Sequence, residues 1–505
     1  MTMILLIGVL ILGGIAAWLA QTWNKDWPRW ISLGTCLIAG LIVLPLYINT
    51  PEIHWTLGGN ETAWIEMVNY AWIPRFGINF LFALDGLSLI MVSLTIFLGF
   101  VAIISSWDEI PDRSGFFQFN LLWTLAGVVG VFTSLDLFLF FFFWEVMLIP
   151  MYLLIAIWGH ENKSYASMKF FLFTQISGLL MLIAILTLVL SNANQTGTIT
   201  FSYFDLVGHG LPEGLSYWLM WGFFIAFVVK LPAFPFHTWL PDAHTQAPTA
   251  ASVLLAGILL KTGAYGLIRF TVPLFPQATV EIADIAMILG AISIIYGAML
   301  AFAQTDFKRL VAYSSVSHMG FVLVGVYAWN ELAMQGAVMQ MIAHGFSTAA
   351  LFMMAGAIQH RIHTRDMTKM SGLWHDMPRM GAVAMFFIIA SLGMPGLGNF
   401  VGEFLVLLGA FSVSIPITIA AAIGLITGAI YALIAMQRVF QGEGKPDRNL
   451  KDFGGRELAA MIPMMIGLIW LGVYPQPVFD LVDPVLSSLH LLTTSDPTQW
   501  IGSLP

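Results

Sequence analysis

The stretch VVKLPAFPFHTWLPDAH, residues 228–244, sets a lysine and three prolines in a largely apolar run. Pro232 and Pro235 each remove a helix hydrogen bond, so the helix that carries Lys230 is expected to break beside the ammonium group. A cation inside hydrocarbon is costly unless it is paired or hydrated. A broken helix next to a buried charge is therefore typical of a membrane transporter.

The composition around this stretch is that of a membrane protein. Of the 505 residues, 58% are hydrophobic and 10% are charged, whereas a soluble domain carries roughly 25% charged residues. A helix needs about 20 apolar residues to cross a bilayer, and runs of that kind recur along the chain. The modest net charge of -8, without a basic stripe, excludes a nucleic-acid-binding protein.

Apolar runs separated by polar, proline or glycine residues predict an all-α polytopic membrane protein with about fourteen transmembrane helices. The spans are expected near residues 2–21, 29–48, 84–107, 116–134, 136–158, 168–191, 217–240, 247–270, 281–303, 308–328, 332–357, 381–412, 415–440 and 457–475.

An even number of spans places both termini on one side of the membrane, and the basic residues indicate which side. With the termini outside, sixteen of the twenty basic residues fall in cytoplasmic connections, as the positive-inside rule requires. Arg75 and Arg269 fall at the outer side. The first apolar run, residues 4–20, is expected to be a retained helix because no basic region precedes it. The cytoplasmic set is Lys25, Arg29, Arg113, Lys163, Lys169, Lys308, Arg309, Arg361, Arg365, Lys369, Arg379, Arg438, Lys445, Arg448, Lys451 and Arg456.

Four ionisable residues lie inside predicted spans: Glu145, Lys230, Lys261 and Glu403. Glu403 follows residues 393–398, which are rich in glycine and proline and predict a second broken helix. Ionisable residues in hydrocarbon are functional more often than structural. We therefore predict that these four carry the function of the protein.

The two interrupted spans are the seventh and the twelfth, and this odd displacement reverses the direction of the chain. Helices 4–8 and 9–13 are therefore expected to form two inverted five-helix repeats with broken helices 7 and 12. The expected units are the first three helices in 1–115, the first repeat in 116–270, the second repeat in 281–440, and a cytoplasmic loop, helix 14 and an outer tail in 441–505.

Buried acids and lysines can exchange protons when their charges are balanced by one another. Burial disfavours the charged forms of Glu145 and Lys230, whereas proximity of the two favours them. Such a pair would hold Lys230 charged. Loosening the pair would let the proton of Lys230 move to the next site. The sequence thus predicts proton translocation, a preference supported by the lack of a dense oxygen cluster for sodium.

Histidines supply the intermediate steps, because imidazole titrates near neutral pH. His318 and His344 lie within predicted spans and are expected to relay protons. His237, His244 and Asp242 follow the break at the cytoplasmic end of helix 7, where we expect protons to be taken up.

Each of these residues also has a structural interpretation. The acid and lysine can form a static ion pair between two helices, and the intramembrane histidines can serve only in packing. The three residues at the cytoplasmic end can cap a loop. His360 and His363 resemble a metal-binding pair, but they lie in a basic loop without a third ligand, so no metal site is predicted.

No cofactor is expected in this chain. Cys36 is the only cysteine, whereas an iron–sulfur cluster usually needs about four thiolates. Gly396, Gly398 and Gly402 miss the spacing of a dinucleotide-binding fingerprint and lie in an apolar span.

The segment 228–244, with its continuation through residues 247–249 and 260–263, closely resembles the signature of the complex I and Mrp antiporter family. The resemblance extends over nearly the whole chain. It includes Phe143–Trp144–Glu145, Lys308–Arg309 with Ala312–Tyr313–Ser314–Ser315, and Met341–Ile342–Ala343–His344.

Within this family the charge on helix 12 distinguishes the members, because it is lysine in the L and N types and in the larger Mrp subunits. Here it is Glu403, so the chain resembles the M-type membrane subunit of bacterial complex I. The same resemblance is carried by residues 363–367, 372–374 and 394–404.

The resemblance implies a bacterial inner-membrane subunit that moves protons from cytoplasm to periplasm. It implies a hydrophilic axis through Glu145, Lys230, Lys261, His318, His344 and Glu403. By the same resemblance, FMN, iron–sulfur clusters and quinone belong to other subunits, L-type and N-type subunits flank this chain, and a lateral helix of the L-type subunit crosses it.

Two alternatives stay open at this point. An Mrp-type cation/proton antiporter or a membrane-bound hydrogenase subunit is the nearest one, and Glu403 with its glycine-rich helix argues against both. A non-conducting membrane scaffold is an alternative of another class. Charge-neutral substitutions in an assembled complex would separate the scaffold from a proton-translocating subunit.

Overall fold

A computed structural model describes residues 1–48, 64–208, 210–443 and 450–494. Within these residues a two-stranded antiparallel hairpin consists of β1 (Glu66–Ile73) and β2 (Ile78–Leu84). The helices are α1 (Thr2–Ala20), α2 (Trp27–Ile48), α3 (Gly86–Ser105), α4 (Ser114–Thr133), α5 (Leu137–Trp158), α6 (Lys163–Thr196), α7 (Tyr203–Leu206), α8 (Glu213–Lys230), α9 (Trp239–Gln246), α10 (Thr249–Leu254), α11 (Leu260–Gly266), α12 (Val272–Leu274), α13 (Pro276–Glu281), α14 (Ala283–Phe302), α15 (Phe307–Tyr327), α16 (Glu331–Ile362), α17 (Leu373–Asp376), α18 (Pro378–Ser391), α19 (Gly398–Phe411), α20 (Ile415–Val439), α21 (Gly455–Val473) and α22 (Gln476–Thr494). Short 3₁₀ turns, η2 (Pro74–Phe76) and η5 (Met367–Lys369), and π-helical turns, η3 (Leu255–Leu259) and η4 (Leu267–Thr271), complete the described elements.

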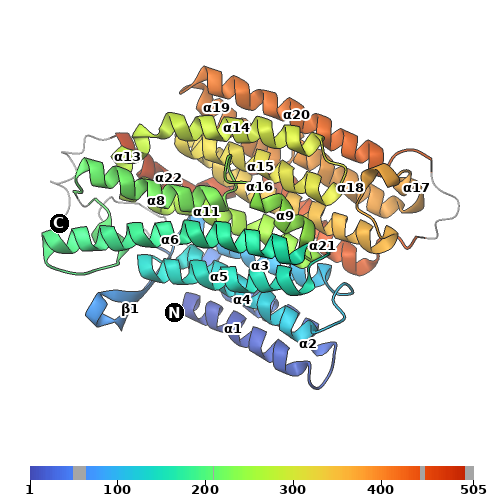
Figure 1. Cartoon of the computed structure of the whole chain (residues 1–505), viewed down its shortest axis with the longest axis horizontal. Helices are drawn as coiled ribbons and strands as arrows, with labels where there is room; N and C mark the ends of the chain where they lie inside the picture. The colour runs from blue at the N-terminus through green and yellow to red at the C-terminus, as the bar shows by residue number, and fades with distance from the viewer. Residues whose placement is uncertain (49–63, 209, 444–449, 495–505) are drawn as a thin grey trace.

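The long helices run side by side along the long axis of the molecule (Figure 1). The strand β1 and helix α13 lie at one end, and α17 lies at the opposite end (Figure 1). The predicted outer connections lead to the first end, and predicted cytoplasmic connections lead to the second. The all-α polytopic fold is therefore confirmed.

Twelve helices of the described residues are long and apolar enough to cross a membrane. They correspond to twelve of the fourteen predicted spans. The other two predicted spans, 217–240 and 381–412, are the interrupted ones. The first breaks after α8, and the second is divided into α18 and α19, so the spans that carry Lys230 and Glu403 are broken as their prolines and glycines predict.

Several boundaries differ from the prediction. The third span was expected from residue 84, but Leu84 ends β2, and α3 begins at Gly86. The hairpin was missed because strands of eight and seven residues are too short to register as membrane spans. The C-terminal segment contains the amphipathic helix α22, which a search for membrane-length apolar runs overlooks. Lys445 and Arg448, placed in a cytoplasmic connection, lie outside the described residues.

Lys261 and His318 lie in the two most buried spans. The segment Thr249–Leu274, with Lys261, is wholly buried over its most apolar stretch, and α15, with His318, is 94% buried. The peripheral helices α2 and α21 are only 28% buried. Lipid-facing apolar helices therefore surround a core that contains the charges.

Candidate functional site

Glu145 and Lys230 face each other across α5 and α8 without a direct bond. Each acts electrostatically on the other, but neither Lys230 Nζ nor Glu145 Oε1 has a hydrogen-bond partner among the described residues. A side-chain hydrogen bond joins Glu145 to Gln175 on α6. Glu145 and Lys230 are therefore coupled electrostatically without a hydrogen bond between them.

Aromatic rings hold the ammonium group of Lys230. Its Nζ lies 5.2 Å from the ring centroid of Trp144 and 5.6 Å from that of Phe170. The negative face of an aromatic ring attracts a cation at this distance. The rings thus offset part of the cost of burying the charge, at the residue where α8 ends.

Lys261 makes direct contacts. Its Nζ donates to the carbonyl oxygen of Ala256 at 2.6 Å and lies 2.7 Å from His344 Nδ1. Ala256 belongs to the π-helical turn η3, where the hydrogen-bond ladder is widened. When Lys261 is charged, its ammonium group donates to Nδ1 of His344.

A second cluster surrounds Glu403. Its Oε1 lies 2.8 Å from His318 Nδ1 and accepts from Gln340 Nε2 at 3.0 Å. His318 Nε2 lies 3.3 Å from the hydroxyl of Ser391, the last residue of α18. Ending α18 at this point thus places a hydroxyl against the histidine. Gly393 lies beside the carboxylate, because a side chain there would meet Glu403 Oε2.

The two histidines join these clusters. The ring centroids of His318 and His344 are 5.5 Å apart. Lys261, His344, His318 and Glu403 therefore form one buried line, with side-chain exposures of 7% and 1% for His318 and Glu403 and no exposure for Lys261 and His344. Four of the residues singled out from the sequence come together here.

The line is interrupted between the two lysines. Lys230 and Lys261 lie on adjoining helices, and Gly263 packs against Lys230, since a Cβ on Gly263 would lie 3.2 Å from the Lys230 Cβ. No direct side-chain bond between the two lysines is present in the described part of the chain. Proton transfer between them requires a change of arrangement or an intervening group.

The three residues expected to take up protons do not form one cluster. Asp242 binds Lys169 Nζ at 2.6 Å, and His237 packs against Tyr296 with ring centroids 5.3 Å apart. His244 is fully buried and is electrostatically coupled to Lys261. Of the three, only His244 adjoins the buried line.

A polar cavity of about 730 Å³ lies where α3 and α16 end and α10 and α21 begin. It is lined by Glu109, His160 and Thr249 among others. The Glu109 carboxylate accepts from the backbone N–H of Thr249 at 3.1 and 3.2 Å. Burial lowers the pKa of His160 to about 4, and repulsion by Lys308 and Arg365 adds to this shift.

The place of Glu109 in the cavity wall and the burial of Lys308 were not predicted from the sequence. Glu109 follows α3 in a short loop, and its position after a span resembles that of any solvent-exposed acid. Lys308 was counted as a cytoplasmic basic residue, but it is 1% exposed and donates to the carbonyl oxygen of Ala247 at 2.5 Å. The start of a span does not reveal that other helices cover it.

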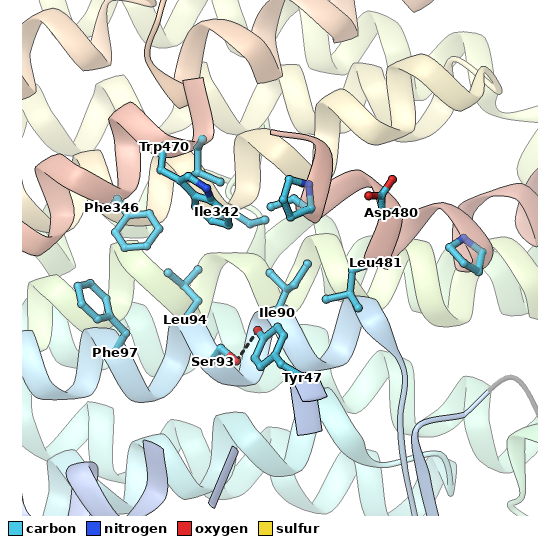
Figure 2. Close-up of a pocket in the computed structure, with 14 residues that line it drawn as sticks. Tyr47, Ile90, Ser93, Leu94, Phe97, Ile342, Phe346, Trp470, Asp480 and Leu481 are labelled. Carbon is cyan, nitrogen blue, oxygen red and sulfur yellow. Dashed lines mark hydrogen bonds between the residues drawn. The ribbon is translucent and has the colours of Figure 1, made fainter. Parts of the chain in front are cut away.

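A second cavity of about 730 Å³ is apolar and lies between α3, α16, α21 and α22. Figure 2 shows Phe97, Phe346 and Trp470 along it, with Tyr47 bonded to Ser93 at 2.8 Å. None of the residues of the buried line contributes to this cavity. Its apolar lining does not suit proton transfer.

A family model described as NADH:quinone oxidoreductase/Mrp antiporter, TM, matches residues 134–430. The chain belongs to the NADH:quinone oxidoreductase/Mrp antiporter family. The matched residues of this family include every position of the buried line.

Within this family, the chain is similar in sequence to proteins named NADH-quinone oxidoreductase subunit M. NADH-quinone oxidoreductase subunit M of Pseudomonas aeruginosa is 51% identical over 99% of this chain and 97% of its own length. Subunit M of Escherichia coli K12 is also 51% identical, over 94% of this chain and 95% of its own length. A chain of respiratory complex I from Thermus thermophilus superposes with a TM-score of 0.88 at 30% identity, over 98% of this chain and 100% of that one.

The predicted family and the predicted resemblance to subunit M are therefore confirmed. The chain is a proton-translocating, multi-pass membrane subunit of this family.

Proposed function

We propose that this chain moves protons along the buried line Lys261, His344, His318 and Glu403, with Glu145 and Lys230 controlling the occupancy of Lys261. The observation that carries the proposal is the continuity of this line, with contacts of 2.7 Å at one end and 2.8 Å at the other. A lysine, two imidazoles and a carboxylate can each bind and release a proton.

The step between Lys261 and His344 follows from their hydrogen bond. The charged lysine donates to His344 Nδ1, so transfer of that proton leaves a neutral amine and an imidazolium. The imidazolium then lies beside His318, whose Nδ1 faces the Glu403 carboxylate. Each transfer ends on a group that can receive a proton, and Glu403 is the last acceptor of the line.

The pair of Glu145 and Lys230 supplies the control. A positive Lys230 on the helix next to Lys261 disfavours a second positive charge there. A shift of Lys230 toward Glu145 lessens this repulsion, and Lys261 then takes up a proton. The absence of a direct bond between Glu145 and Lys230 within the described residues leaves room for such a shift.

Uptake takes place at His244, reached from the polar cavity beside Glu109. Thr249 and Gly356 line the cavity, and Phe352, one turn before Gly356 on α16, stacks on His244 with ring centroids 4.2 Å apart. His237 and Asp242, also predicted for uptake, lie along the same segment between α8 and α10, His237 buried and Asp242 partly exposed.

We further propose the assembly that the relatives suggest. The chain serves as a membrane-arm subunit of a NADH:quinone oxidoreductase in a bacterial inner membrane, with both termini in the periplasm. FMN, iron–sulfur clusters and quinone are held by other subunits, and this chain has no redox site of its own. L-type and N-type subunits flank it, a lateral helix of the L-type subunit crosses it, and helices 4–8 and 9–13 form inverted repeats.

The test is proton pumping by the assembled oxidoreductase with Lys261→Met. NADH-driven acidification of inverted vesicles should fall by about a hundredfold, since removal of one proton-transfer group typically has this effect. Assembly is checked by electrophoresis of the intact complex. Lys25→Met, which changes an exposed lysine, is the matched control.

Normal pumping by an assembled Lys261→Met complex would overturn the proposal and favour a non-conducting scaffold. Pumping that depends on added sodium would favour the Mrp-type alternative instead.

A further inference from the structure

A polar stripe leads away from Lys261 in the direction opposite to the cytoplasmic cavity. Lys261, Tyr265 and Arg269 are spaced four residues apart on α11 and η4, and residues at this spacing share one helix face. With a rise of about 1.5 Å per residue, Arg269 lies about 12 Å from Lys261 along the axis. Arg269 pairs with Asp85, at the end of β2.

The whole stripe is buried. The side chains of Arg269 and Asp85 are 4% and 1% exposed, and the guanidinium carbon lies 5.2 Å from the ring centroid of Trp64. The stripe leads from Lys261 toward the end that carries the hairpin, and charged and hydroxyl groups line it. A row of polar groups through a membrane protein can carry protons, or a fixed positive charge within it can exclude them.

The hydrogen bonds along the stripe decide between these possibilities. The Tyr265 hydroxyl donates its single proton to the carbonyl oxygen of Phe132 at 2.9 Å. It accepts from Arg269 Nε at 3.2 Å and lies 3.0 Å from the hydroxyl of Ser88. The guanidinium group of Arg269 also donates to Asp85.

Arginine is unsuited to proton relay. Its side chain has five donors and no acceptor, and it stays charged in proteins. A proton that arrives from Lys261 finds no free acceptor on the Arg269 side chain. The positive charge of Arg269 also repels the proton. Asp85 fixes the guanidinium group in this place, and it also caps α3 by accepting from the N–H of Ser88 at 2.9 Å.

We propose that Arg269, positioned by Asp85 and Tyr265, closes the direct outward route from Lys261. A proton on Lys261 then leaves through His344, His318 and Glu403, and outer protons do not flow back to Lys261. Arg269 is a positioning residue, since it acts by exclusion and receives no proton. The inference rests on the proposed function of Lys261.

The experiment measures passive proton flux through the assembled oxidoreductase in liposomes without NADH, driven by a potassium diffusion potential. Arg269→Gln should raise the flux severalfold, and NADH turnover should continue with fewer protons pumped per NADH. Arg269→Lys keeps the positive charge but supplies a side chain that can release its proton, so its flux should lie between those of the parent and Arg269→Gln. Arg29→Gln, which removes a guanidinium from the exposed pair with Asp26, should leave the flux unchanged.

A purely structural ion pair gives a different result. The Arg269→Gln complex would then be less stable, but the complexes that assemble would show the same passive proton flux as the parent. An unchanged flux of this kind overturns the proposal. If Arg269→Gln prevents assembly, the neutral pair Asp85→Asn with Arg269→Gln keeps the shape of both side chains and removes both charges, a change that buried ion pairs often tolerate. An unchanged flux in that variant also overturns the proposal.

Combining Arg269→Gln with Lys261→Met separates this inference from the proposed function. Loss of the added flux in the combined variant supports a route through Lys261. Flux that persists without Lys261 contradicts the inference. Normal pumping by Lys261→Met alone would contradict the proposed function even if Arg269→Gln leaks.

Discussion

The Glu145–Lys230 pair and the His318–Glu403 pair, one in each half of the molecule, hold their charges in different ways. On the side of α5 and α8, Glu145 and Lys230 act on each other without a direct bond. On the side of α15 and α19, His318 and Glu403 are joined at 2.8 Å. If the expected inverted repeats are correct, both pairs lie on the second and fourth helices of a repeat, with acid and base exchanged.

A glutamine on the third helix accompanies each pair. Gln175 on α6 bonds to Glu145, and Gln340 on α16 donates to Glu403. The interruptions differ, because Lys230 is the last residue before its break, whereas Glu403 comes after the break between α18 and α19. The first half is therefore suited to a change in electrostatic coupling, and the second half to proton transfer along a fixed contact.

The largest difference between the halves should appear when each acid is made neutral. Glu403→Gln removes the last acceptor of the contact line, and proton pumping should fall by about a hundredfold. Glu145→Gln removes only an electrostatic influence, and pumping should fall by about tenfold, since one charge at a distance contributes about 1–2 kcal/mol.

NADH-driven pumping and quinone reduction by the assembled complex measure both effects. Equal losses in the two variants would contradict the distinction between a control half and a transfer half. Assembled Glu145→Ala that keeps full pumping and turnover would make Glu145 structural.

A smaller effect is expected at the two glutamines. Gln340→Leu removes a neutral donor to Glu403, and a single hydrogen bond is worth about 0.5–1.5 kcal/mol, or about a 2- to 10-fold change in rate. Gln175→Leu should have an effect at the lower end of this range, because Gln175 contacts only the control pair. Initial pumping rates at fixed NADH compare the two. A greater loss in Gln175→Leu would reverse the roles of the halves.

Much of the fold was predictable because membrane spans are specified by local composition. Lys230 stood out in an apolar run that contains Pro232 and Pro235, and α8 does end at that lysine. Glu403 stood out after residues 393–398, and α18 and α19 are separated there. These signals depend on a few neighbouring residues, and the cost of a charge in hydrocarbon makes each of them conspicuous.

The partners of each charge were not predictable, because they come from distant segments. Gln340, Ser391 and Asp85 are ordinary polar residues in the sequence, and only the packing of α16, α18 and β2 gives them their neighbours. Arg269 was assigned to the outer side by counting spans, which does not reveal that it is buried. The line from Lys261 to Glu403 was suggested by resemblance, and its contact distances required the structure.

The smallest effect is expected outside both halves, at His160 beside the uptake cavity. Its pKa falls from 6.5 to about 4 in the folded chain, so between these values the unfolded chain binds more protons than the folded one. The stabilisation is fully present above pH 6.5 and is lost as the pH falls toward 4.

His160→Gln should therefore lose less thermal stability than the parent complex when the pH is lowered from 7 to 5. Melting of the purified complex at both pH values measures this loss. Pumping above pH 6.5 should change little, because His160 is already neutral there, whereas a parallel loss of stability in parent and variant would show that His160 is not shielded from protonation.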